Sequence, residues 1–315
     1  MSALRVVQAG PYSTVQDAGR FGSQRFGISP AGAADPALLA IANRLAGNAP
    51  DAAAIECTLL GDTYEVAVES LRLAVAGDVA MKIDGEAAAP WRSYRLARGQ
   101  KLRIGPCRTG LRFYVAVEGG IACAPVLGSR ATHVRTGIGG IEGRRLKAGD
   151  ALPLAQDAVA TRPELGFDPA RLPPAPERLR VVLGPQDDYF TPAGIATFLG
   201  SDYAVARDAD RMGCRLEGPA IEHAKGHNII SDGIPLGGIQ VPGNGQPIAL
   251  MRDRQTTGGY PKIACLIGPD VARLAQKRPG EAVRFAALSP AEAQEAVRAQ
   301  AARLAECLAG IVPLE

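Results

Sequence analysis

The chain has 315 residues, 47% of them apolar, which is typical of a globular protein long enough to form two domains. Its 35 Lys and Arg residues nearly balance 32 Asp and Glu residues, so the net charge of +3 does not favour generic binding to nucleic acid or to an anionic membrane. No apolar run approaches about 18 residues and the 6 cysteines form no CxxC pair, so we expect a cytoplasmic protein with reduced thiols.

A helix is predicted just after residue 35. Asp35 is a good N-cap, Pro36 suits the first turn and Gly47 can end the helix. Between them, apolar side chains recur at helical spacing and would form a buried face: Leu38, Leu39, Ile41, Ala42 and Leu45.

Three later segments share one pattern, in which a glycine is followed by an acid or amide and then by alternating polar and apolar residues. They cover residues 98–104, 148–154 and 279–285, and each reads as a turn followed by a half-buried strand. The side chains expected to face a core are Leu102, Ile104, Leu152, Leu154, Val283 and Phe285. Together with 37 glycines and 24 prolines, this pattern favours a mainly β fold with closed or strongly curved antiparallel sheets.

The sequence also suggests domain boundaries. Residues 161–178 are rich in proline and charge and lack periodicity, so we expect a linker there between domains at 1–160 and 179–288. A C-terminal helix is expected over 289–310, because Ser289 and Glu292 form a capping box. Its predicted apolar stripe consists of Val297, Ala301, Leu304 and Leu308.

Several familiar motifs are incomplete. The glycines at 136–143 lack GxGxxG spacing and lead into a strand, so we interpret them as turns. The Ala-Met-Lys at 80–82 resembles a biotin attachment site, but Asp84-Gly85 makes an ordinary hairpin turn there and Lys82 is expected to be solvated. His223 and His227 have helical metal-ligand spacing without further ligands, so no metal site is expected.

The segment with the most chemistry runs from residue 248 to residue 267. Two apolar strand-like runs, 248–251 and 263–267, flank a dense group of polar side chains, although a turn such as Gly258-Gly259 would suffice to connect a strand pair. So many hydrogen-bonding groups exceed what a connection requires. They indicate recognition of a polar ligand.

Two further polar clusters lie at residues 14–20 and 208–219. Each can be explained by ion pairing within its own loop. The alternative is that Arg211 and Arg215, together with Arg252 and Arg254, supply fork-shaped donors to a carboxylate, phosphate or carbonyl group. Such arginines would form an anion-binding pocket.

Long stretches of the chain resemble the KipA family. The resemblance rests on TVQDAGRFGSQRFGISPAGAADP at 14–36, ATHVRTGIGGIEGRRLKAGD at 131–150, DRMGCRLEGP at 210–219 and IQVPGNGQPIALMRDRQTTGGYPKIA at 239–264. This family includes the C subunit of 5-oxoprolinase, the proteins called allophanate hydrolase subunit 2, and half of the carboxyltransferase domain of urea carboxylase. The resemblance implies two β-barrel-like domains, the second of them cyclophilin-like.

The resemblance also implies partners and a reaction. A KipI-like B subunit and a LamB/YcsF-like A subunit would join this chain to open 5-oxo-L-proline to L-glutamate, with ATP consumed by the complex and little activity expected without partners. No covalently bound cofactor is expected. Two alternatives stay open: a biotin-dependent carboxyltransferase acting on a urea-like substrate, and a non-catalytic regulator that binds a KipI-like protein.

Candidate site residues follow from the chemistry of a lactam that carries a carboxylate. The expected catalytic residues are Asp253, Arg254 and Lys262, with Asp253 acting as a base or merely holding Arg254. The expected substrate-binding residues supply cations, amides and hydroxyls: Arg211, Arg215, Gln240, Gln246, Gln255, Thr256, Tyr260, Gln16, Asp17 and Arg20.

Overall fold

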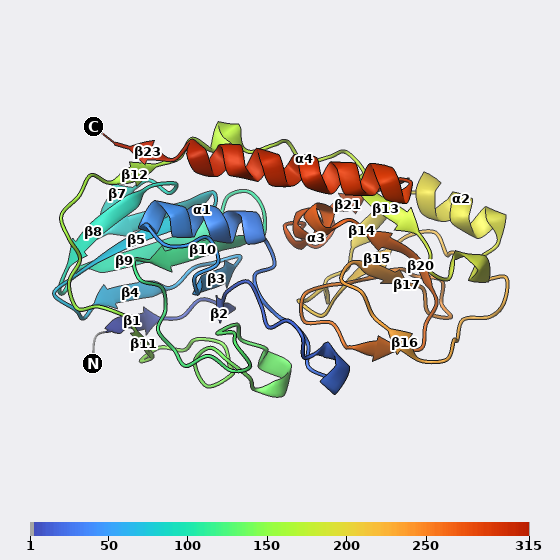
Figure 1. Cartoon of the computed structure of the whole chain (residues 1–315), viewed down its shortest axis with the longest axis horizontal. Coiled ribbons are helices and arrows are strands. Elements are labelled where there is room, and N and C mark those ends of the chain that lie inside the picture. Colours follow the sequence, from blue (N-terminus) through green and yellow to red (C-terminus); the bar gives the residue numbers. More distant parts are fainter. Residues whose placement is uncertain (1–2, 315) are drawn as a thin grey trace. The chain divides into compact units, whose positions relative to one another are not determined.

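A computed structural model of the chain describes residues 3–314, which divide into two compact units (Figure 1). The first unit comprises residues 3–20, 31–173 and 304–314, and the second comprises 21–30 and 174–303. The long uninterrupted part of the first unit ends at Pro173, within the stretch expected to be a linker. Unlike the contiguous domains expected from the sequence, the second unit includes a short segment, 21–30, from near the N-terminus.

The first unit contains two antiparallel sheets. The six-stranded sheet has the order β11-β1-β4-β9-β6-β7, with strands Ala151–Pro153, Ala3–Gln8, Thr63–Val66, Lys101–Cys107, Val79–Ile83 and Glu86–Ala88. The five-stranded sheet has the order β2-β3-β10-β5-β8, with strands Ser13–Gln16, Ala54–Thr58, Arg112–Val117, Ser70–Ala76 and Ser93–Ala97. A short pair, β12 (Leu165–Gly166) and β23 (Val312–Pro313), completes the strands of this unit.

Side chains from both sheets share one core. Leu4 and Tyr64 of the six-stranded sheet join Leu73 and Phe113 of the five-stranded sheet in this cluster. Helix α1 (Pro36–Ala46) covers the opposite face of β5 and β10, where small residues such as Ala74 allow close approach (Figure 1). The helix has the expected Asp35 N-cap and a left-handed Gly47 at its C-terminus, so the prediction of this helix is confirmed.

The second unit is built on an eight-stranded sheet of order β21-β14-β15-β18-β17-β20-β13-β22. These strands are Ala282–Val283, Tyr203–Val205, Gly213–Glu217, Ile248–Leu250, Gly238–Gln240, Lys262–Leu266, Leu179–Leu183 and Phe285–Ala287. The two end strands are separated in sequence only by Arg284, so one continuous segment borders both edges and nearly closes the sheet into a barrel. The prediction of a mainly β, barrel-like fold is confirmed, and all six side chains expected to face a core are buried.

The connection between β18 and β20 differs from expectation. These strands are not neighbours, because β17 lies between them and pairs with both. Residues 251–261 are therefore a crossover past the end of β17 rather than a hairpin turn. Within this crossover, β19 (Thr257–Gly258) pairs with β16 (Asp232–Gly233).

Helices α2 (Pro192–Gly200) and α3 (Gly268–Ala275) belong to the second unit, whereas α4 (Pro290–Ala309) has residues 290–303 in the second unit and 304–309 in the first. The capping box of α4 is confirmed, since the Glu292 backbone N–H donates to the Ser289 hydroxyl and the Ser289 backbone N–H donates to the Glu292 carboxylate. The predicted apolar stripe is only partly buried: Leu304 and Leu308 are half-buried, but Ala301 is exposed. Val297 is 41% exposed, whereas the buried positions are Ala293 and Cys307, because the helix packs mainly at its two ends.

Among residues 3–314, no helix is both long enough and apolar enough to cross a membrane. Lys82 is an exposed residue of β6, and Asp84 and Gly85 have the positive φ angles of a tight hairpin turn. The Ala-Met-Lys tripeptide is thus part of an ordinary hairpin.

Candidate functional site

The crossover from β18 to β20 places polar side chains over the end of β17. Gln240 is the last residue of β17 and pairs with Ile248 on one side and Lys262 on the other. Because paired residues point to the same face of a sheet, Gln240 and Lys262 share a face with the side chains that the crossover brings across. Figure 1 shows β17 and β20 side by side in this unit, and β18 lies between β15 and β17 in the sheet.

Arg254 is the most unusual charge of this cluster. Its side chain is only 6% exposed, yet its guanidinium donates to backbone carbonyls alone: Nε to Ile234 O at 3.1 Å and Nη1 to Met251 O at 3.5 Å. Burial, together with repulsion from Arg252, lowers the pKa of Arg254 to about 10. The group remains charged at neutral pH, and among the described residues no carboxylate pairs with it. A buried cation of this kind favours an anionic ligand.

Asp253 is held by Arg211 and not by Arg254. Nε and Nη2 of Arg211 donate to the two carboxylate oxygens of Asp253 at 3.0 and 2.9 Å, and both side chains are buried. The backbone N–H of Asp253 also donates to the carbonyl of Arg211 at 2.8 Å. This fork-to-fork pair fixes the turn that carries Arg254, which supports a positioning role for Asp253 in place of a base.

Lys262 is fully buried and its ammonium donates to Asp232 at 3.1 Å. Gln186 joins the pair: its amide nitrogen approaches the same Asp232 oxygen at 3.3 Å, while its amide oxygen accepts the backbone N–H of Lys262 at 3.1 Å. The hydrogen bond from Lys262 is the main cause that holds the pKa of Asp232 below its usual value. Neither Asp232 nor Gln186 was identified from the sequence, because each lies in a separate segment with no motif spacing to Lys262.

Three side chains extend the cluster with neutral donors and acceptors. The amide nitrogen of Gln240 donates to Tyr260 O at 3.3 Å, and its amide oxygen meets the Gln255 amide nitrogen at 3.5 Å. The amide oxygen of Gln255 is buried and has no hydrogen-bond partner among residues 3–314. An N–H group of a ligand would satisfy it. Tyr260 itself is 40% exposed at the edge of the cluster.

Gly258 fits tightly against these amides. A Cβ atom at this position would lie 2.7 Å from the amide nitrogen of Gln240 and 3.0 Å from Ile234. A side chain there would push the amides out of place. The glycine in the ThrThrGlyGly motif therefore serves close packing of the site as well as chain reversal.

The segment from near the N-terminus also touches this cluster. Gln24 donates to Ile234 O at 2.9 Å, so it shares this carbonyl with Arg254, and the Ser29 hydroxyl donates to Arg252 O at 3.1 Å. Gln24 was not predicted from the sequence as a site residue, although it lies within the motif at 14–36. Its distance in sequence from Ile234 hid the contact.

The remaining predicted residues of this unit are Arg215, Gln246 and Thr256, and the first two form their side-chain contacts with other segments. Arg215 is largely exposed and pairs with Asp208 at 3.0 Å. Gln246 uses both ends of its amide to bind the backbone of Gly218. Thr256 accepts a hydrogen bond from Ile234 N at 3.0 Å through its carbonyl.

Gln16, Asp17 and Arg20 belong to the first unit, where they hold loops together. The Asp17 carboxylate accepts from Ser129 and from the backbone of Arg130, each at 2.6 Å. Arg20 is almost fully buried and donates to the carbonyl of Ala131 at 2.6 Å. The contacts of Asp17 and Arg20 bind the 14–20 loop to the 126–132 segment.

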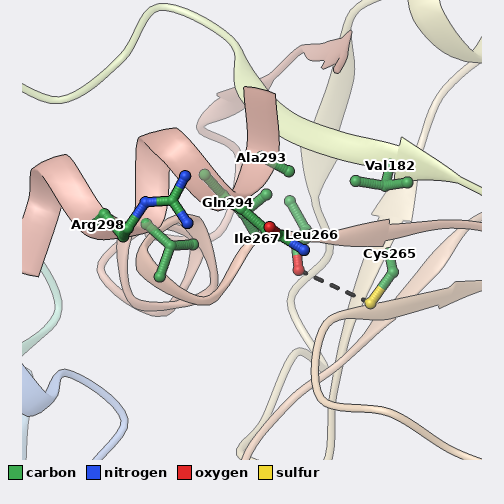
Figure 2. Close-up of a pocket in the computed structure, with 8 residues that line it drawn as sticks. Val182, Cys265, Leu266, Ile267, Ala293, Gln294 and Arg298 are labelled. Atoms are coloured by element: carbon green, nitrogen blue, oxygen red, sulfur yellow. Dashed lines mark hydrogen bonds between the residues drawn. The ribbon is translucent and has the colours of Figure 1, made fainter. Parts of the chain in front are cut away.

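A separate cavity of about 370 Å³ lies between the barrel and α4 (Figure 2). None of the predicted site residues lines it; its walls are Val182, Cys265, Leu266, Ile267, Ala293, Gln294, Val297 and Arg298. Burial raises the pKa of the Cys265 thiol, which donates to backbone carbonyls, so this group is not poised as a nucleophile. Within residues 3–314, no group of His, Cys, Asp or Glu has metal-binding geometry.

The sequence is similar to those of known proteins over nearly all of its length. The 5-oxoprolinase C subunit of Escherichia coli is 39% identical over 93% of this chain and 94% of its own length. The 5-oxoprolinase C subunit of Haemophilus influenzae is 37% identical over 89% of this chain and 90% of its own length.

A solved structure has the same fold. The urea carboxylase of Kluyveromyces lactis matches 99% of this chain with a TM-score of 0.88 and 29% identity, and this chain spans only 30% of that longer protein. The family model described as "Carboxyltransferase domain, subdomain A and B" matches residues 26–287. The chain therefore belongs to the family of carboxyltransferase domains with subdomains A and B.

Proposed function

We propose that this chain is the C subunit of an ATP-dependent 5-oxoprolinase, which opens the lactam ring of 5-oxo-L-proline to form L-glutamate. The observation that carries the proposal is the near full-length similarity to two 5-oxoprolinase C subunits, at 39% and 37% identity. In the complex, a KipI-like B subunit and a LamB/YcsF-like A subunit complete the active site. The complex uses ATP, and the chain alone is inactive.

The Arg254 and Lys262 cluster suits this substrate. 5-Oxoproline presents a carboxylate, a ring N–H and a lactam carbonyl. Two buried cations match the carboxylate and the negative charge that develops on the lactam oxygen, and the unpaired amide oxygen of Gln255 matches the ring N–H. Arg254 and Lys262 bind and stabilise charge, while Asp253 positions the turn through Arg211.

A lactam is a poor electrophile, so ring opening requires activation. Transfer of a phosphoryl group from ATP to the amide oxygen would make the ring carbon electrophilic enough for water to add. The C–N bond would then break as the nitrogen takes up a proton, which leaves an acyl phosphate whose hydrolysis gives glutamate and inorganic phosphate. The residues of this chain would orient the ring and neutralise charge during that step. The ATP-binding residues would come from a partner protein of the complex.

Reconstitution tests the proposal. The purified chain is mixed with the A and B subunits, and glutamate is measured after addition of 5-oxoproline and ATP. We expect glutamate only when all three proteins and ATP are present. The absence of ATP-dependent glutamate from the complete mixture would refute the proposal.

A carboxyltransferase acting on a urea-like substrate is the second candidate. It is favoured by the structural similarity to K. lactis urea carboxylase, with a TM-score of 0.88. In that reading, biotinylated partners would supply carboxybiotin. Urea has no carboxylate, so a transfer assay with carboxybiotin and urea, compared with the glutamate assay, separates the two candidates.

A further inference from the structure

We propose that Asp232 is an internal stand-in for the substrate carboxylate, and that substrate binding displaces it from Lys262. This inference rests on the proposed function, because it assigns the binding position of a carboxylate-bearing substrate within the same cluster. It also assigns Arg254 to the lactam oxygen, since the carboxylate is held by Lys262.

The geometry around Lys262 resembles a carboxylate receptor. The ammonium of Lys262 and the amide nitrogen of Gln186 both converge on Oδ2 of Asp232, at 3.1 and 3.3 Å. Gln186 is itself oriented, because its amide oxygen accepts the backbone N–H of Lys262. Two oriented donors would hold the carboxylate of a ligand as well as that of Asp232.

The two partners differ in exposure. The Lys262 side chain is 1% exposed, whereas that of Asp232 is 52% exposed. A nearby anion stabilises a buried ammonium, because an uncompensated buried charge is unfavourable. Asp232 can return to water at little cost. Exchange of one carboxylate for another therefore leaves the charge of the buried site unchanged.

Asp232 lies on a lightly attached segment, which we call the strap, residues 226–233. Every strap residue except Ile229 is exposed, and Ile230 is 94% exposed. The strap is held to the crossover by the two-residue pairing of β16 with β19 and by a hydrogen bond from Ile229 N to Gly259 O at 2.8 Å. With so few buried contacts, this segment can open at low free-energy cost.

The first test compares ligand affinity in wild type and Asp232→Asn. Calorimetry on the reconstituted complex would use 5-oxoproline and 2-pyrrolidinone, which has the same ring without the carboxylate. If the open state of the wild type is populated at about 10%, removing the competing carboxylate should tighten 5-oxoproline binding about tenfold. Binding of 2-pyrrolidinone should not change. Equal or weaker binding of 5-oxoproline by a folded Asp232→Asn complex would overturn the inference.

The second test uses the wild-type complex, so it does not depend on a variant folding. Hydrogen exchange at the Ile229 amide, which is bonded to Gly259 in the free state, should accelerate when 5-oxoproline binds. Slower exchange on binding would overturn the inference.

The matched control for the affinity test is Asp188→Asn, which breaks the exposed ion pair with Lys225 in the same unit and should leave the affinity for 5-oxoproline unchanged.

Acetate separates this inference from the proposed function. As a bare carboxylate, saturating acetate should also accelerate exchange at Ile229. A complex that forms no glutamate but opens the strap with acetate would refute the oxoprolinase assignment and retain the carboxylate exchange. A strap that does not respond to acetate or to 5-oxoproline would refute the exchange itself.

Discussion

Replacing Arg254 with methionine should abolish function without weakening the fold. Burial lowers the pKa of Arg254 from its ordinary value to about 10, which corresponds to about 3 kcal/mol of unfavourable interaction for the charged form. Arg254→Met removes this cost and fills the space with an unbranched apolar chain. Two hydrogen bonds to carbonyls are lost in exchange, worth about 1.5 kcal/mol each.

Both carbonyl oxygens keep a hydrogen-bond donor in this variant. Ile234 O still accepts from Gln24, and Met251 O still accepts from the backbone N–H of residue 254. Because these gains and losses nearly cancel, we expect the free energy of unfolding to stay within about 1 kcal/mol of the wild type and the melting temperature to change by only a few degrees. Calorimetry of the isolated chain measures this directly.

The activity should fall although the stability does not. If Arg254 stabilises the charge on the lactam oxygen, Arg254→Met should lower kcat for glutamate formation by about 100- to 1000-fold, with a smaller effect on KM. A stable variant with normal kcat would refute the catalytic role. A loss of more than about 2 kcal/mol of stability would show that the guanidinium is structural.

The same substitution at Arg180 is the matched control. Arg180 forms a two-pronged salt bridge with Asp270, which has no exposed surface. Arg180→Met leaves that carboxylate without its guanidinium and should destabilise the chain by about 3 kcal/mol. The prediction is therefore that Arg→Met lowers stability at Arg180, which is paired with a buried carboxylate, and not at Arg254.

Three further outcomes can be checked. Gly258→Ala places a Cβ atom 2.7 Å from the Gln240 amide and should lower the rate of glutamate formation by about tenfold or more. The circular dichroism signal of helix and sheet should change little. Gly200→Ala, which has open space around it, should leave the rate unchanged. Arg72→Met removes a fully buried guanidinium from Glu118 and Glu164, and urea unfolding should show a loss of about 3 kcal/mol in the stability of the first unit. A loss of stability below about 1 kcal/mol would contradict a structural role for these ion pairs. The Lys262 ammonium lowers the pKa of Asp232, so their pairing stabilises the fold above the unfolded pKa of about 3.9 and is lost as the pH falls through the lower folded value; an NMR titration of the Asp232 carboxyl that gives a pKa above about 4 would contradict the pairing.

Local chemistry made parts of the fold predictable. Asp35, Pro36 and Gly47 define α1 because capping depends on residues adjacent in sequence. The buried positions of the half-buried strands were likewise correct, since alternation along a strand depends only on that strand. Val297 and Ala301 of the stripe predicted on α4 are exposed, because an apolar helix face is buried only where another element covers it.

The candidate site also has parts that could be predicted from the sequence and parts that could not. The sequence by itself identified the polar crossover around Arg254 and Lys262, because its side chains exceed what a connection needs. Only the tertiary structure inserted β17 between β18 and β20, paired Asp253 with Arg211, and brought Asp232 and Gln186 to Lys262. These contacts join residues up to 76 positions apart. The order of strands in a barrel is set by the burial of the whole core, and no local pattern encodes which distant acid will meet which base.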